Sequence, residues 1–147
     1  MKAGLSKITP RSLSDAQVAA LAVAAVPTKT FHKKQTAVSI NALNTDVTTF
    51  TGLPAKYIVR RITVFDASAN LGASAAEIAV FTAAAGGGTA VVASAVLTGL
   101  TAATKFSDRT IATSADYLTA ATLYVRNTVA HGSAATVSII LEYEDLT

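Results

Sequence analysis

The chain has 147 residues, a formal net charge of +3 and 51% hydrophobic residues, enough for one domain with an ordinary core. It contains no Cys, which excludes disulfides, thiolate metal sites and cysteine nucleophiles, and no apolar run reaches the roughly 18 residues of a membrane span. Ala and Thr together exceed a third of the chain, so we expect a core of small and β-branched side chains. Charged residues make up only 14%, below the usual quarter, so we expect part of the surface to be covered by a partner.

The charge is divided unevenly along the chain. Residues 1–61 hold nine of the twelve Lys and Arg and two of the nine acids, a formal charge of +7, and residues 62–147 carry −4. A basic front and an acidic back favour docking to an acidic surface or to another copy of the chain. A tail that carries solubilising Lys is the alternative.

Residues 1–34 form a predicted N-terminal arm. Ser14 and Gln17 fit a capping box, and the apolar spacing that follows predicts a short helix over 15–25, which Pro27 ends. A helix this short needs a packing partner. A secretory signal is the rival interpretation, but Asp15 and Gln17 interrupt the apolar stretch, so we expect no signal peptide.

From residue 35 onward the pattern is one of short β-type segments rich in Val, Ile, Thr, Tyr and Phe, separated by turn residues. Eight strands are predicted, at 36–41, 46–50, 57–65, 77–83, 89–96, 106–112, 121–128 and 135–143. In the last, Val137, Ile139, Leu141 and Tyr143 are predicted to point to one face, and Ser138, Ile140, Glu142 and Glu144 to the other.

The breaks between these strands indicate the fold class. Gly-rich residues 86–88 read as a hairpin tip, residues 67–76 as a loop, and residues 131–133 as a hairpin loop between the last two strands. Strands spaced by about twelve residues predict an all-β, jelly-roll-like sandwich over 35–147, preceded by the arm. The pairing order of the strands is left open.

Motifs for chemistry are weak. Gly86–Gly88 lacks the Lys-Ser/Thr and the helix of a phosphate-binding loop, and neither His32 nor His131 has a ligand neighbour at zinc spacing. The few carboxylates do not form an obvious catalytic pair, and Glu142 and Glu144 are spaced for a solvated edge. We therefore expect no enzyme, no catalytic residues, no metal and no cofactor.

Binding to a partner is the better-supported expectation. The basic cluster around Phe31 gives an electrostatic footprint, but scattered aromatics do not form a nucleic-acid stacking platform, so no nucleic acid is expected. The residues expected to dock a partner are Lys2, Lys7, Arg11, Lys29, His32, Lys33, Lys34, Arg60 and Arg61.

A glycan ligand is a further alternative. It would contact the loops at 67–76, 86–88 and 129–134. The chain has no Trp to stack on sugar rings, and its Tyr residues at strand positions favour core or interface roles.

Three stretches resemble small β-sandwich virion proteins of tailed bacteriophages, of the head-decoration, head-fibre or spike-base type. They are LPAKYIVRRITVFDAS (53–68), FTAAAGGGTAVVA (81–93), and LTAATLYVR (118–126) with GSAATVSIIL (132–141). The resemblance covers about residues 50–143, in texture and order rather than through a diagnostic motif, and carries over no catalytic residue.

The resemblance implies a structural protein made in the bacterial host cytoplasm and located in the virion. Its implied partners are copies of itself, with a trimer favoured, and the major capsid protein or another virion protein. The arm 1–34 would be the natural anchor, so we expect its deletion to leave a folded domain that no longer attaches. A tail-associated or host-glycan-binding module is the alternative function.

Overall fold

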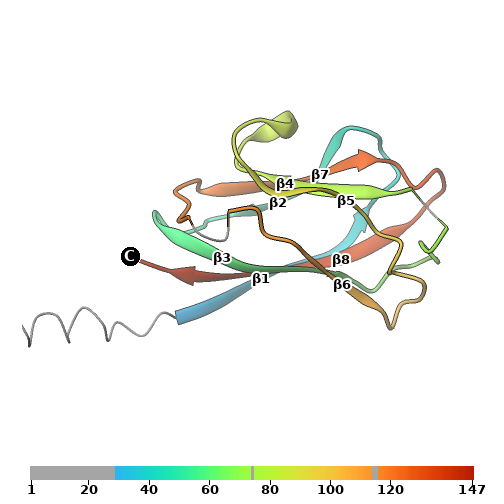
Figure 1. Cartoon of the computed structure of the whole chain (residues 1–147), viewed down its shortest axis with the longest axis horizontal. Coiled ribbons are helices and arrows are strands. Elements are labelled where there is room, and N and C mark those ends of the chain that lie inside the picture. Colours follow the sequence, from blue (N-terminus) through green and yellow to red (C-terminus); the bar gives the residue numbers. More distant parts are fainter. Residues whose placement is uncertain (1–28, 74, 114–115) are drawn as a thin grey trace, which may run out of the picture.

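The computed structural model describes residues 29–73, 75–113 and 116–147 and confirms the predicted β-sandwich. Two four-stranded antiparallel sheets lie face to face (Figure 1). Sheet A has the order β1-β8-β3-β6 and sheet B the order β2-β7-β4-β5. The elements are β1 (Lys29–Ser39), β2 (Thr45–Thr51), β3 (Tyr57–Phe65), β4 (Glu77–Phe81), the 3₁₀ turn η1 (Ala84–Gly86), β5 (Ala90–Val96), β6 (Phe106–Arg109), β7 (Thr122–Val129) and β8 (Thr136–Asp145).

The pairing order is that of a jelly roll. β1 pairs with β8, β2 with β7, β3 with β6 and β4 with β5, all antiparallel. This is the pattern of one long antiparallel ribbon bent at the β4–β5 turn. Pairing of β3 with β8 and of β4 with β7 then rolls the ribbon into two sheets, which is the eight-stranded architecture expected from the strand spacing.

The core lies between the sheets and follows the predicted alternation. Val137, Ile139, Leu141 and Tyr143 of β8 are buried against residues of sheet B such as Phe50. Ser138 lies on the other face and is buried as well, and its hydroxyl is satisfied there by donating to an Asp66 carboxylate oxygen at 3.3 Å. A period-two pattern thus places the core side of this strand correctly.

Polar side chains close both open sides of the sandwich. Between the edge strands β1 and β2, the Gln35 amide donates to the Thr49 carbonyl at 2.8 Å. Between β6 and β5, the Arg109 guanidinium donates to the carbonyls of Ala95 and Val96 at 3.3 and 3.0 Å, and burial lowers the Arg109 pKa. These contacts occupy carbonyls near the edge strands and thereby oppose edge-to-edge aggregation.

Two sequence-based predictions are corrected. The first strand begins at Lys29 rather than at residue 36, because Phe31 stacks on Tyr143 with ring centroids 5.7 Å apart and residues 29–35 pair with β8. Residues 131–133 do not form a hairpin loop, because β7 and β8 belong to different sheets. The predicted hairpin tip at 86–88 is confirmed, and the predicted helix over 15–25 lies outside the described residues.

Tyr57 provides a test of the packing at alkaline pH. Its ring is fully buried, its hydroxyl donates to the Ala120 carbonyl at 2.9 Å, and burial raises its pKa. An unfolded Tyr ionises near pH 10. Un-ionised Tyr57 therefore makes its full contribution to the free energy of unfolding below that pH, and this contribution is lost as the pH rises above it.

We expect Tyr57→Phe to cost about 1 kcal/mol at neutral pH, through the lost hydrogen bond. Its stability should then fall less steeply than that of the wild type above about pH 10, by up to about 1.4 kcal/mol per pH unit. Urea unfolding across that range measures both effects, with the exposed Tyr117→Phe as control. Equal alkaline slopes for wild type and Tyr57→Phe would contradict the argument.

Candidate docking face

The outer face of sheet A carries polar and apolar side chains in rows set by the strand register. We call this surface the outer face of sheet A throughout. One row crosses all four strands as Lys34, Ile140, Thr63 and Asp108. The neighbouring rows are His32, Glu142 and Arg61 on one side, and Ser138, Phe65 and Phe106 on the other.

A β-bulge explains why Arg60 and Arg61 are both exposed on this face. The register of β3 against β8 shifts between Val59 and Arg61, and such a bulge lets two consecutive side chains oppose a single partner residue. Arg60 pairs with Glu144 at 2.6 Å and Arg61 pairs with Glu142. Hydrogen bonds to these carboxylates raise the pKa of both arginines.

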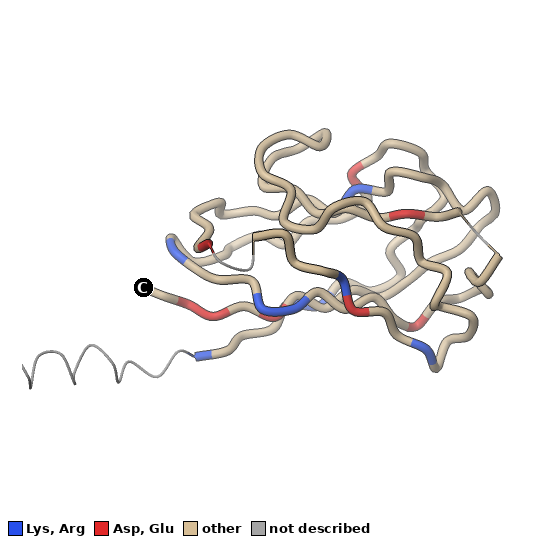
Figure 2. Tube along the Cα trace, in the orientation of Figure 1, with Lys and Arg blue, Asp and Glu red and all other residues tan. Residues whose placement is uncertain are grey.

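The ion pairs correct the prediction that Glu142 and Glu144 form a solvated edge. Their strand, β8, is central in sheet A, and their side chains are only 19% and 15% exposed. His32 Nε2 also lies 3.5 Å from a Glu142 carboxylate oxygen. Figure 2 shows the basic stretch of β3 next to the acidic end of β8.

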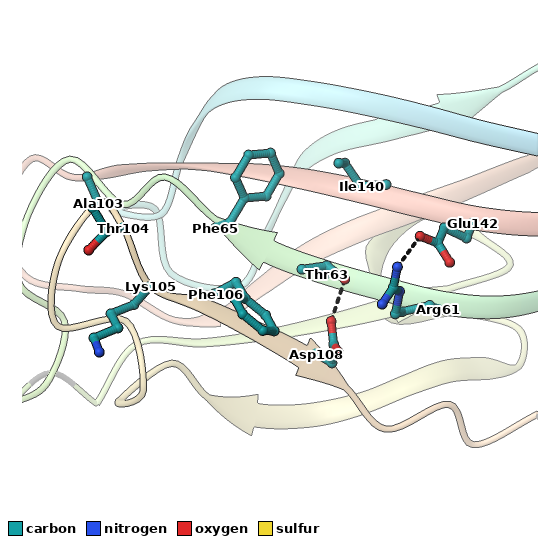
Figure 3. Close-up of a pocket in the computed structure, with 10 residues that line it drawn as sticks. All are labelled: Arg61, Thr63, Phe65, Ala103, Thr104, Lys105, Phe106, Asp108, Ile140 and Glu142. Carbon is teal, nitrogen blue, oxygen red and sulfur yellow. Dashed lines mark hydrogen bonds and ion pairs between the residues drawn. The ribbon is translucent and has the colours of Figure 1, made fainter.

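An open hollow of about 350 Å³ lies on the same face (Figure 3). Phe65, Phe106 and Ile140 supply its apolar surface, and Lys105 and Asp108 contribute charge. Phe106 is 67% exposed, the largest exposed fraction among the large hydrophobic residues described.

The polar side chains around the hollow are held by neighbours on the same face. The Thr63 hydroxyl donates to Asp108 at 2.5 Å, and Lys34 Nζ lies 5.1 Å from the Phe65 ring centroid. Sequence reasoning did not find this hollow. The sequence held one indication of it: the alternation of β8 places the apolar Ile140 on the otherwise polar outer face.

The predicted docking residues do not form one basic patch. Lys2, Lys7 and Arg11 lie outside the described residues. His32 and Lys34 lie on the outer face of sheet A, as do Arg60 and Arg61. Lys33 lies on the opposite, inward face of β1. Lys29 lies at the start of that strand, with its Nζ 5.9 Å from the Phe31 ring centroid.

The outer face of sheet B differs because the β4–β5 hairpin covers part of it (Figure 1). The Ala85 amide donates to Asp46 Oδ2 at 2.7 Å, and Arg126 Nη1 pairs with Asp46 Oδ1 at 3.0 Å. Gly88, at φ +70°, is needed in this turn because a Cβ there would lie 2.3 Å from the Thr82 hydroxyl oxygen.

The three loops proposed for a glycan are therefore not gathered at one place. Loops 67–76 and 129–134 lie at one end of the sandwich, where the Ser68 amide donates to the Thr136 carbonyl at 2.9 Å. Residues 86–88 belong to the hairpin that is fixed to β2 on sheet B. A single glycan site built from all three loops does not fit this arrangement.

The comparisons with known proteins give no match. No family model fits the chain, and neither a curated protein nor a solved structure is similar to it at a significant level. Within 29–73, 75–113 and 116–147, no group of three or more His, Asp or Glu side chains is placed to hold a metal ion. No helix among these residues is long and apolar enough to cross a membrane.

Proposed function

We propose that the chain is a non-enzymatic structural protein of a tailed-phage virion, assembling as a homo-oligomer on the capsid as a decoration, head-fibre or spike-base protein. The observation that supports this best is the outer face of sheet A. It joins an exposed apolar hollow to ordered rows of charge, and the face belongs to a jelly roll, a fold that viral capsid proteins use.

The chemistry of this face supports a binding role rather than catalysis. Glu142 is held by Arg61 and Asp108 by the Thr63 hydroxyl, so these carboxylates fix neighbouring side chains. Exposed apolar surface rimmed by polar residues marks protein interaction sites. The proposed partners are further copies, with a trimer favoured on the phage resemblance, and the major capsid protein or another virion protein.

Particle composition tests the virion assignment directly. A bacterial strain that carries the gene is induced, released particles are purified by density, and their proteins are identified by mass spectrometry. We expect peptides of this chain at a stoichiometry comparable to that of other particle proteins. A chain that is made in the cells but absent from purified particles would overturn the proposal.

A host-glycan-binding module is the second candidate, and the exposed Phe106 ring beside Asp108 is the observation that favours it. An aromatic face next to hydrogen-bonding groups is able to stack on a sugar ring. Saturable binding of host polysaccharide, lost in Phe106→Ser, would favour this candidate over the assembly role.

A further inference from the structure

We infer that the outer face of sheet A is a two-fold interface with a second copy of this chain. The two-fold axis runs parallel to the strands, between β8 and β3, so that it exchanges β8 with β3 and β1 with β6. This inference rests on the self-assembly part of the proposed function, and it names the surface through which two copies meet.

The charges on this face are sorted by strand. The outward charged residues of β1 (Lys34) and of β3 (Arg60 and Arg61) are basic. Those of β8 (Glu142 and Glu144) and of β6 (Asp108) are acidic. In sheet order β1-β8-β3-β6 the signs therefore alternate.

This alternation makes the face complementary to itself about the inferred axis. Each basic strand meets an acidic strand of the second copy, as an isologous interface requires. Lys34 lies opposite Asp108 of the second copy, and Glu142 lies opposite Arg61 of the second copy. A two-fold axis in the same plane but across the strands would set each strand on itself and oppose like charges, which disfavours it.

The same rotation covers apolar surface. Ile140 comes over Thr63 of the second copy, and Phe65 comes over the β8 backbone at Ser138 of the second copy, a residue whose side chain is buried. Sheets packed face to face in this manner stay close to aligned. Three strands that contribute about seven residues each, with the four residues of β6, give a flat area near 400 Å² per copy at about 3.3 Å per residue and about 4.8 Å between strands. That is below the usual size of a stable interface, so the dimer should be weak and depend on concentration.

Lys34 and Asp108 offer a test because the structure shows no ion pair between these two side chains within one chain. They lie on the two edge strands of sheet A, with β8 and β3 between them, a separation of about 14 Å at ordinary strand spacing. A charge reversal at one position that is rescued by reversal at the other must therefore act between copies.

The experiment measures the mass of the full chain by light scattering over a range of concentrations, at low and high salt. The variants are Lys34→Glu, Asp108→Lys and the double variant, and Lys56→Glu is the control because Lys56 lies off this face, over the Tyr117 ring. We expect an even-numbered assembly for the wild type: a dimer, or a hexamer if the favoured trimer also forms and two trimers join through this face. Each single reversal should weaken association by about tenfold or more, and the double variant should return it to within about threefold of the wild type. Lys56→Glu should leave it unchanged.

A second measurement does not depend on how the charge variants fold. The chain has no Cys, so a Lys34→Cys, Asp108→Cys variant treated with a short bis-maleimide linker should give covalent dimers on a denaturing gel. Either single Cys variant should give far fewer.

The outcomes separate the two proposals. A wild type that assembles but ignores the reversals and does not cross-link, or that forms only odd-numbered rings, overturns the two-fold interface and leaves self-assembly through another surface. A wild type that is monomeric at every concentration overturns the interface and the self-assembly proposal together. The virion assignment is decided separately, by the particle composition.

Discussion

A chain that lacks residues 1–34 should lose more than about 3 kcal/mol of stability. The deletion removes most of β1, including Phe31 and its ring contact with Tyr143. It also leaves the facing stretch of β8 without its neighbour over the positions from Ile140 to Asp145. Thermal unfolding followed by circular dichroism measures the effect, and we expect a broad transition or none.

Deletion of residues 1–28 is the matched control. It leaves β1 and the buried core of the described residues in place, so we expect a clearly higher melting temperature than for the 1–34 deletion. Equal melting temperatures for the two deletions would show that residues 29–34 contribute little to the sandwich. A test of the N-terminal arm as an anchor should therefore cut after residue 28, not after residue 34.

Asn127→Ala should destabilise the chain by about 2–5 kcal/mol. Asn127 is fully buried in β7, and its amide donates to the carbonyls of Ile40 and Ala42, each at 2.8 Å. These carbonyls belong to the connection from β1 to β2. Without the side-chain amide, the Ile40 carbonyl keeps only the His131 amide as a donor, at 2.9 Å, and the Ala42 carbonyl loses its side-chain donor. Loss of a buried donor costs more than the average hydrogen bond contributes.

Urea unfolding measures the loss, and Asn127→Asp separates its causes. Asp keeps the size of the side chain but replaces the donating amide with an oxygen, so no cavity forms. If the hydrogen bonds matter, Asn127→Asp should be at least as unstable as Asn127→Ala. An Asn127→Asp variant as stable as the wild type would refute the argument.

The strands could be predicted from the sequence because burial follows local alternation. Tyr57–Phe65 shows both the strength and the limit of that pattern. Its bounds were predicted as they are found, but the bulge that exposes both Arg60 and Arg61 depends on pairing with Glu142, 81 residues further along the chain. The predicted start of a strand is wrong where its inward-facing residues are polar. This is the case for β1, whose inward positions include Lys33 and Gln35.

The outer face of sheet A could not be predicted from the sequence for a related reason. His32, Arg61 and Glu142 meet only because β8 lies between β1 and β3, and nothing local specifies that order. The misassigned loop at 131–133 has the length of a hairpin connection. The same few residues are enough to cross the roughly 10 Å between two packed sheets, so length alone does not decide between the two.

The pairing of β1 with β8 has a consequence for how the chain folds as it is synthesised. Lys29 can pair only after Asp145 has been synthesised, more than a hundred residues later, and contacts this distant in sequence form slowly. β4 and β5, joined by a short turn, are able to pair much earlier. While it waits, β1 is protected from joining a foreign sheet edge by Lys29, Lys33 and Lys34, because charged strand residues oppose such pairing. The basic residues of β1 would thus act first in the nascent chain, against wrong strand pairing, and later in the folded domain as surface charge.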